Sequence, residues 1–219
     1  MKTAAILEQL EAFYGPQEPC WPTDPYAFLI WLHCGYPASD SLCARGWESL
    51  NQSIGVQPEQ LLAASIPQLT KAMKPGGMVP ERRAMRLQEI ATRVQNEFAG
   101  DLSGRLSGPD ARKLLKKFPN IADPGADRIL LFAKIAPLAA VPSNCPQVLV
   151  RIQRGRERDN YVVTYKEAQA AIEKEVPQNF EARMRAYLLL KQHGQELCKR
   201  TKPKCDRCPV RAGCAFVTA

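Results

Sequence analysis

The sequence predicts an all-α fold, on three observations. Apolar residues recur at helical spacing along most of the chain, and no convincing alternation of apolar and polar residues appears. The one strand-like run, YVVTY at 161–165, is too short to found a sheet. Proline stands where the first turn of a helix tolerates it, at Asp24-Pro25, Gly108-Pro109 and Asp123-Pro124.

In chain order, the first helix is the short amphipathic segment MKTAAILEQLEAF. A Gly/Pro turn at 73–83 and a basic turn at 152–160 are predicted to join later helices. Tryptophans early in the chain predict a core cluster there, from Trp21, Trp31 and Trp47. The predicted helices are 3–13, 25–34, 40–52, 57–64, 66–73, 81–98, 109–118, 124–136, 143–154, 164–175 and 179–193.

The chain carries excess positive charge. It has 30 Lys and Arg against 22 Asp and Glu, a formal net charge of +8 over 219 residues. This balance favours a polyanionic partner, most often nucleic acid. The alternative is a soluble basic protein with no such partner.

The cysteines point to a metal rather than to disulfides. The N-terminal segment lacks the long apolar core of a signal peptide, and no apolar run approaches the ~20 residues that span a bilayer. We therefore expect a cytoplasmic protein, in which thiols stay reduced and the eight cysteines serve as ligands or core residues. Four scattered cysteines are predicted to be small buried apolar side chains: Cys20, Cys34, Cys43 and Cys145.

The remaining four cysteines form a compact loop with the spacing C-x6-C-x2-C-x5-C. They are Cys198, Cys205, Cys208 and Cys214. Four thiolates can enclose an iron–sulfur cluster or a zinc ion, although a zinc ribbon usually pairs two C-x2-C knuckles and only one is present. Basic residues between the cysteines do not hold a metal, so we expect the loop also to face an anion. These residues are Lys199, Arg200, Lys202, Lys204, Arg207 and Arg211.

The segment before this loop, AYLLLKQHGQELC (186–198), contains the pattern H-G-x-x-x-C with His193 and Gly194. Together with the cysteine spacing it resembles the endonuclease III and adenine-mismatch glycosylase superfamily of DNA repair enzymes. The resemblance implies a two-lobed, all-α helix-hairpin-helix DNA glycosylase fold with a C-terminal 4Fe–4S cluster, structural zinc being the alternative. It implies that the cluster is not a hydrolytic catalyst. It also implies phosphate contacts from the basic loop, or else a solvated charge run, by Lys199, Arg200, Lys202 and Lys204.

The resemblance extends to FPNIADPGADRILLFA (118–133), which matches the family hairpin L-P-G-[VI]-G-x-K-x-A. In the family, backbone N–H groups of this hairpin bind a DNA phosphate, which here implies Asn120, Ile121 and Ala122. Asn120 and Ala122 replace the two hairpin glycines. Asparagine tolerates a left-handed backbone, whereas a positive φ at alanine costs about 1 kcal/mol.

Two family catalytic positions fall on prolines. The Schiff-base lysine of bifunctional members corresponds to Pro124, and the essential aspartate corresponds to Pro142 within AAVPSNCPQVLVR (139–151). Proline has no amine to attack a sugar and no carboxylate to stabilise an oxocarbenium-like sugar or activate water. Lyase activity is therefore not expected, and the catalytic residue is unknown.

Other ionisable residues near the hairpin do not earn a catalytic assignment. Asp123, followed by proline, is read as a helix N-cap. Asp127 is read as a surface residue, Lys134 as an amine on the same helix, and Asp159 as a loop residue.

The N-terminal half carries the resemblance more weakly. The segment 24–50 resembles the part of the family that opens the helical lobe, but the glutamine that fills the gap left by a flipped base is missing. Tyr36 lies near its place, as a wedge between bases or as an ordinary turn residue. The helix in 80–98 resembles the long helix before the hairpin. Its arginines, read as a solvated face or as phosphate contacts, are Arg82, Arg83 and Arg86.

These readings lead to one domain division and three functions. We expect a helical lobe at 26–136, with the helix-hairpin-helix near 109–135, and a second lobe made of 1–25 and 137–219 with the cluster loop at 198–214. The first function is a monomeric base-excision repair glycosylase acting on damaged or mismatched double-stranded DNA, nucleoid-associated if bacterial. The second is a non-catalytic DNA-binding or damage-sensing iron–sulfur protein, and the third an electron-transfer protein.

Overall fold

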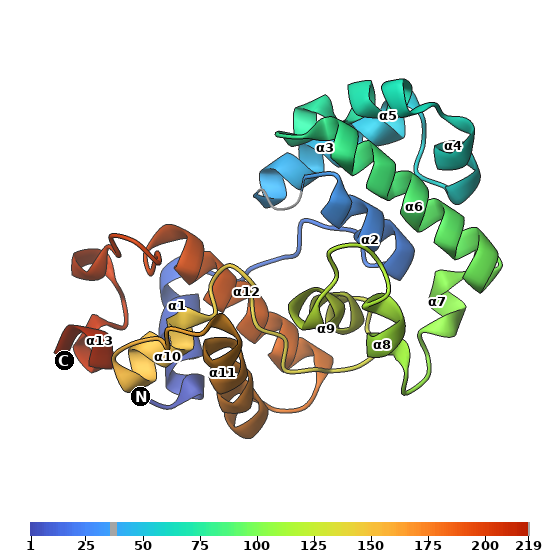
Figure 1. The fold of residues 1–219 in the computed structure, drawn as a ribbon. Coiled ribbons are helices and arrows are strands. Elements are labelled where there is room, and N and C mark those ends of the chain that lie inside the picture. Colours follow the sequence, from blue (N-terminus) through green and yellow to red (C-terminus); the bar gives the residue numbers. More distant parts are fainter. Residues whose placement is uncertain (36–38, 219) are drawn as a thin grey trace. The chain divides into compact units, whose positions relative to one another are not determined.

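The computed structural model describes residues 1–35 and 39–218, and within these ranges the chain is helical and contains no strand (Figure 1). The predicted all-α class is confirmed. The α-helices are α1 (Thr3–Tyr14), α2 (Pro25–His33), α3 (Asp40–Ser53), α4 (Pro58–Ala63), α5 (Ile66–Met73), α6 (Pro80–Phe98), α7 (Leu102–Arg105), α8 (Ala111–Leu115), α9 (Asp123–Phe132), α10 (Gln147–Arg154), α11 (Tyr161–Glu175), α12 (Phe180–Glu196) and α13 (Ala215–Thr218). Short 3-10 helices are η1 (Lys74–Gly76), η2 (Cys205–Arg207) and η3 (Arg211–Gly213).

Polar side chains fix several helix starts. The Asp24 carboxylate accepts a hydrogen bond from the Ala27 N–H at 2.8 Å, and Pro25 occupies the first turn, where a missing N–H costs nothing. The Asn179 side chain accepts in the same way from the Ala182 N–H at 2.8 Å. These starts agree with the sequence prediction because side-chain caps and prolines are legible in the chain itself.

The strand-like run at 161–165 is not a strand. It forms the first turn of α11, because the Asn160 side chain accepts hydrogen bonds from the Val162 N–H (2.8 Å) and the Val163 N–H (3.3 Å). A cap thus overrides the β-propensity of two adjacent valines. Both valine side chains are exposed.

Two other helices are shorter than predicted, one at its start and one at its end. The helix predicted at 143–154 begins only at Gln147, because the Cys145 N–H bonds back to the Pro142 carbonyl at 2.9 Å and closes a turn. The helix predicted at 124–136 ends at Phe132. The short helices α7 and α13 were not predicted, since a single helical turn shows too little periodicity in the sequence to be recognised.

Contacts divide the chain into two compact units, each with its own core. One unit consists of Met1–Pro19 and Leu130–Ala219, and the other of Cys20–Ile129. In the first unit, α1 packs against α12, and α10 packs against α11, α12 and α13 (Figure 1). Its core includes Ile6, Leu10 and Leu189, all at most 1% exposed.

The second unit is built around α6, which packs against α2, α4 and α5. An aromatic cluster also lies in this unit: the Trp21 ring stacks on Phe28 with centroids 5.7 Å apart, and it lies 5.9 Å from Trp31. The Arg128 guanidinium lies over the Trp21 ring at 3.9 Å, a cation–π contact. Trp47 is only partly buried, so the predicted cluster holds for two of the three tryptophans.

Three of the four scattered cysteines are buried as predicted. Cys34, Cys43 and Cys145 are at most 4% exposed. Cys20 is exposed, and its prediction as a core residue is wrong. The next residue, Trp21, is buried instead.

Candidate metal centre and nucleic-acid interface

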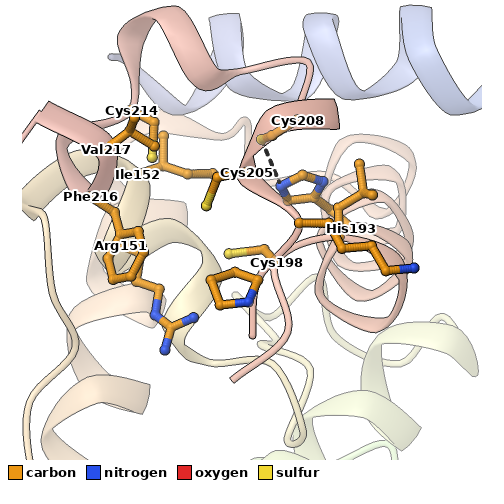
Figure 2. Close-up of a pocket in the computed structure, with 12 residues that line it drawn as sticks. Arg151, Ile152, His193, Cys198, Cys205, Cys208, Cys214, Phe216 and Val217 are labelled. Carbon is orange, nitrogen blue, oxygen red and sulfur yellow. Dashed lines mark hydrogen bonds between the residues drawn. The ribbon is translucent and has the colours of Figure 1, made fainter. Parts of the chain in front are cut away.

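The four C-terminal cysteines line one pocket (Figure 2). The space between the side chains measures about 310 Å³, including its open mouth. Cys214 is buried, and Cys198, Cys205 and Cys208 are partly buried. Apolar side chains complete much of the wall: Ile152, Leu197, Phe216 and Val217.

Short backbone turns place the four thiols on this pocket. The Cys198 N–H bonds to the His193 carbonyl at 2.8 Å as α12 ends, and the Lys204 N–H returns to the Leu197 carbonyl at 2.9 Å. The 3-10 helices η2 and η3 then turn the chain at Cys205 and immediately before Cys214. Each cysteine therefore lies at the end of a tight turn, which leaves the loop little freedom to move a single thiol away.

The surroundings of the thiols disfavour charge on the uncoordinated sulfur. Burial raises the pKa of Cys198 to about 12; the Arg151 guanidinium lowers this pKa and the thiols of Cys208 and Cys214 raise it. Burial also raises the pKa of Cys208, with neighbouring thiols adding to the effect. Four thiols within electrostatic reach of one another require a cationic centre if they are to be thiolates together.

Two kinds of metal centre use four thiolate ligands, a zinc ion and an iron–sulfur cluster. Among the described residues, no three His, Cys, Asp or Glu side chains are arranged to hold a single metal ion. A zinc ion needs its four sulfurs about 2.3 Å from one point, whereas a four-iron cluster spreads its cysteine ligands around a larger body. The pocket supplies four sulfur donors, the ligand set that both a zinc ion and a 4Fe–4S cluster use.

The base of the basic loop is clamped by Arg151 of α10. This side chain is 5% exposed, pairs with the Glu157 carboxylate through Nε and Nη2, and donates to the carbonyls of Lys199 (2.8 Å) and Arg200 (2.9 Å). The clamp fixes the backbone while the Lys199 and Arg200 side chains remain exposed. Lys202 and Lys204 are exposed as well. Their predicted phosphate contacts stay a prediction.

Different contacts explain the histidine and the glycine of the H-G pair, His193 and Gly194. His193 is fully buried, with Nδ1 3.0 Å from the Tyr14 hydroxyl and Nε2 3.6 Å from Cys208 Sγ (Figure 2). Burial lowers the pKa of His193 to about 4. At Gly194 an added Cβ would lie 2.5 Å from Cys145 Sγ and closer still to its Cβ, so only glycine fits.

The predicted hairpin is present, and a left-handed backbone occurs at only one of its two replaced glycine positions. Asn120 has a φ of +56°, as expected for an asparagine in place of glycine. The Ile121 N–H bonds to the Phe118 carbonyl at 3.3 Å, and the Ala126 N–H to the Ala122 carbonyl at 3.0 Å opens α9. Ala122 is not among the left-handed residues, so the strain predicted there does not arise. The Ile121 side chain is buried, which leaves its backbone rather than its side chain for any ligand.

Two basic side chains hold this hairpin. His33 of α2 places Nε2 2.8 Å from the Pro119 carbonyl and Nδ1 2.8 Å from the Leu29 carbonyl. The Asn120 amide faces Arg86 of α6, and with the amide oxygen turned toward the guanidinium it accepts from Nη1 at 2.7 Å and from Nε at 3.0 Å. Arg86 therefore does not extend freely into solvent.

Arg83 has a different role from the one that the sequence suggested. It is 1% exposed and donates to the carbonyls of Met73 (2.9 Å) and Gly77 (2.6 Å) and to that of Cys34. It is neither a solvated residue nor available to a phosphate. The guanidinium instead fixes the Gly/Pro turn, whereas Arg82 is exposed.

The two residues that the sequence aligns with catalytic positions are prolines, which supply no reactive group. Pro124 lies in the first turn of α9, and Pro142 is buried in the turn before α10. Asp123 is the first residue of α9 rather than the residue before it, and its carboxylate lies 2.6 Å from Lys116 Nζ.

Asp127 is 1% exposed, so its prediction as a surface residue is wrong. Its carboxylate pairs with Arg112, at 2.7 Å from Nε and 2.9 Å from Nη2. Lys134 is not on the helix either: it follows the end of α9 with a φ of +54°. Asp159 is exposed in the turn between α10 and α11. Tyr36 lies outside the described residues.

Comparisons with known proteins establish the fold. No protein-family model matches the chain, and no curated protein does. Two endonuclease III–DNA complexes, one a trapped covalent intermediate, match with a TM-score of 0.78 and 18% identity, over 100% of this chain and 97–98% of theirs. A thermostable thymine-DNA glycosylase matches with a TM-score of 0.77 and 20% identity, over 99% of this chain and 96% of that one. A 3-methyladenine DNA glycosylase of H. pylori bound to 1,N6-ethenoadenine matches with a TM-score of 0.67 and 14% identity, over 90% of this chain and 99% of that one. The resemblance read from the cysteine loop is thus confirmed at the level of architecture: the chain has the endonuclease III-like helix-hairpin-helix fold.

Proposed function

We propose that this chain is a base-excision repair protein of the DNA glycosylase type that binds double-stranded DNA as a monomer. One observation carries the proposal: a chain with the endonuclease III fold over its whole length brings four cysteines onto one pocket beneath an exposed basic loop. The ligands of a 4Fe–4S cluster would be Cys198, Cys205, Cys208 and Cys214. When bound, the cluster supplies a cross-link for the loop and a one-electron couple.

Two elements would grip the sugar–phosphate backbone. Lys199, Arg200, Lys202 and Lys204 offer cations on a backbone that Arg151 fixes, which gives affinity without sequence preference. The hairpin offers the backbone of Asn120–Ala122, with the Arg86 guanidinium bonded to the Asn120 side chain. A basic side chain next to the turn would add charge to the backbone N–H groups through which the hairpin of the resembled family binds phosphate.

Glycosylase chemistry on this chain needs a group other than the two family positions. A glycosylase extrudes the target nucleotide and stabilises positive charge on the sugar while water or an amine attacks. Pro124 and Pro142 provide neither amine nor carboxylate. Hydrolysis of the N-glycosidic bond would therefore proceed through a divergent residue, and strand cleavage through a Schiff base at residue 124 is not expected.

A second candidate, a non-catalytic damage-binding protein, is favoured by the ion pairs around the hairpin. The two acids that flank it, Asp123 and Asp127, are paired with Lys116 and Arg112. Each of these carboxylates is thus engaged by a cation that belongs to the fold. Recognition of a lesion without its excision follows if no other acid substitutes.

Binding and base release on the same duplexes separate these functions. The purified protein is titrated against duplexes that each carry one lesion or mismatch, and against undamaged DNA, over a range of salt concentrations. Preferential, salt-dependent binding with base release supports the glycosylase. Preferential binding without base release on any duplex supports the damage-binding protein. A protein that contains iron but binds no DNA at low salt contradicts both, and leaves electron transfer.

A further inference from the structure

A chain of polar contacts runs from the N-terminal helix to one cysteine of the pocket. The Tyr14 hydroxyl of α1 lies 3.0 Å from His193 Nδ1 of α12, and His193 Nε2 lies 3.6 Å from Cys208 Sγ (Figure 2). The histidine is fully buried and the tyrosine partly buried. Two parts of the chain that are far apart in the sequence, α1 and residues 193–208, therefore meet at one imidazole ring.

The protonation of each group decides which atoms donate and which accept along the Tyr14–His193–Cys208 contacts. Burial raises the pKa of the Tyr14 phenol, so its O–H proton stays in place at neutral pH and can be donated to Nδ1. A neutral imidazole carries a single N–H, which then lies on Nε2, facing the sulfur. A metal-bound thiolate accepts hydrogen bonds and cannot donate one. This tautomer is therefore the one in which both contacts are hydrogen bonds once Cys208 is ligated.

Donors meet Cys198 and Cys208 in different ways. Cys198 lies beside the charged Arg151 guanidinium, which lowers the pKa of its thiol, and its backbone carbonyl accepts from Gln147 Nε2 at 3.2 Å. The side chain of Cys208, by contrast, meets a ring nitrogen that the Tyr14 hydroxyl orients. Partners that orient a ligand or donate a hydrogen bond to it tune the properties of a metal centre.

We infer that Tyr14 and His193 form an outer-sphere relay that holds an N–H donor on the Cys208 thiolate and thereby raises the reduction potential of the cluster. The inference rests on the cluster of the proposed function. Reduction adds negative charge to the cluster and its sulfurs, so a donor stabilises the reduced form more than the oxidised form. Tyr14 acts through His193 and is a positioning residue.

Reduction potentials of matched variants test the relay. Tyr14→Phe removes the hydroxyl that orients the ring, His193→Leu removes the donor, and His193→Gln offers an amide N–H in place of Nε2. Tyr161→Phe is the control, because its hydroxyl donates to the Ser143 carbonyl at 3.1 Å and is not part of the pocket lining. Each protein is measured by film voltammetry without DNA, and its iron content is determined in parallel.

We expect a shift to more negative potential, small for Tyr14→Phe and larger for His193→Leu, with partial recovery in His193→Gln and no shift in Tyr161→Phe. A Tyr14→Phe protein with full iron content and the potential of the unaltered protein overturns the relay while leaving the cluster and DNA binding in place. This arm decides the question even if His193→Leu does not fold. An iron-free unaltered protein overturns the cluster itself, a different failure that the iron assay detects directly.

Discussion

Lys134 illustrates at the scale of one residue how this chain ends a helix without glycine. The Ile135 N–H bonds to the Leu130 carbonyl at 2.9 Å and the Lys134 N–H to the Leu131 carbonyl at 3.1 Å, the two bonds of a Schellman motif. Lys134 occupies its left-handed position with a φ of +54°. Glycine is preferred there because it has no Cβ to clash with the backbone.

Lys134→Gly should therefore raise the free energy of unfolding, by up to about 1 kcal/mol. This figure already allows for the larger conformational entropy that glycine loses on folding. Lys134→Ala is the matched control, since it removes the same side chain and keeps the Cβ. Urea unfolding of both variants measures the difference. Equal midpoints for glycine and alanine would show that the backbone at this position is not strained.

Charge in the cysteine loop yields a second prediction at this scale. Lys202→Gln combined with Lys204→Gln removes two exposed cations from the loop. If each contacts one phosphate, the slope of log K for DNA against log salt becomes shallower by about 2.

The matched control for this pair is Lys166→Gln with Lys174→Gln, two exposed lysines of α11 in the same unit. The control variant loses the same net charge as the loop variant, so a general effect of charge would alter both slopes alike. The proposal for the loop requires the slope of the loop variant alone to change, as measured by fluorescence anisotropy at several salt concentrations.

At the scale of elements, α12 packs tightly against the turn before α10. Gly194→Ala would force a methyl against Cys145 and should destabilise the protein by about 1–3 kcal/mol. Gly125→Ala in α9 is the control, because its added Cβ would lie 3.6 Å from Ile121, an ordinary contact. Thermal unfolding compares the two; similar melting temperatures would mean that α12 can move away from Cys145 without cost.

The attachment of α1 is sensitive to pH. The Thr3 N–H donates to the Glu175 carboxylate, and this bond holds the pKa of Glu175 below its usual value of 4.5. A lowered folded-state pKa contributes stability above the unfolded value and loses it as pH falls through the folded value. We expect the unfolding free energy of Glu175→Gln to approach that of the unaltered protein as pH falls from neutrality to about 3. A constant difference between them over this range would exclude the linkage.

Sequence reasoning succeeded for elements whose signals are local. Asp24-Pro25 and the apolar spacing of 80–98 predict helices because capping and periodicity act within a few residues. It failed where a distant partner decides the outcome. The burial of Asp127 depends on Arg112, and the role of Arg83 depends on carbonyls of a turn that only the folded unit brings within reach.

The residues of the candidate site also divide into those that local sequence signals predict and those that they do not. The four cysteines were recognised from their spacing, and Asn120 from its tolerance of a left-handed backbone. Tyr14 and Arg151 were missed. A cation within the apolar run VLVRI is the one signal in the sequence that pointed to a buried arginine, and nothing local marks Tyr14 as a neighbour of a residue near the other end of the chain.

At the scale of the whole molecule, removal of the proposed cluster should affect the two units unequally. Beyond Leu197 the loop has two 3-10 turns, and apart from the cysteines its one fully buried apolar side chain is Val210. Loss of the cluster should therefore abolish amide protection in 198–214 and leave 20–129 unchanged. Hydrogen exchange with and without iron checks this, and loss of protection throughout 20–129 would contradict it.

The first unit is discontinuous, since its opening helix packs against segments made last. During synthesis on the ribosome, the apolar stripe of α1 emerges before any segment that could cover it. Residues 20–129, once synthesised, contain all the segments of their own core. The inserted unit can thus fold before the host unit is complete. Closure of the host then waits for α12, so a truncated nascent chain would expose Ile6, Leu7 and Leu10 to chaperones until the last helices arrive.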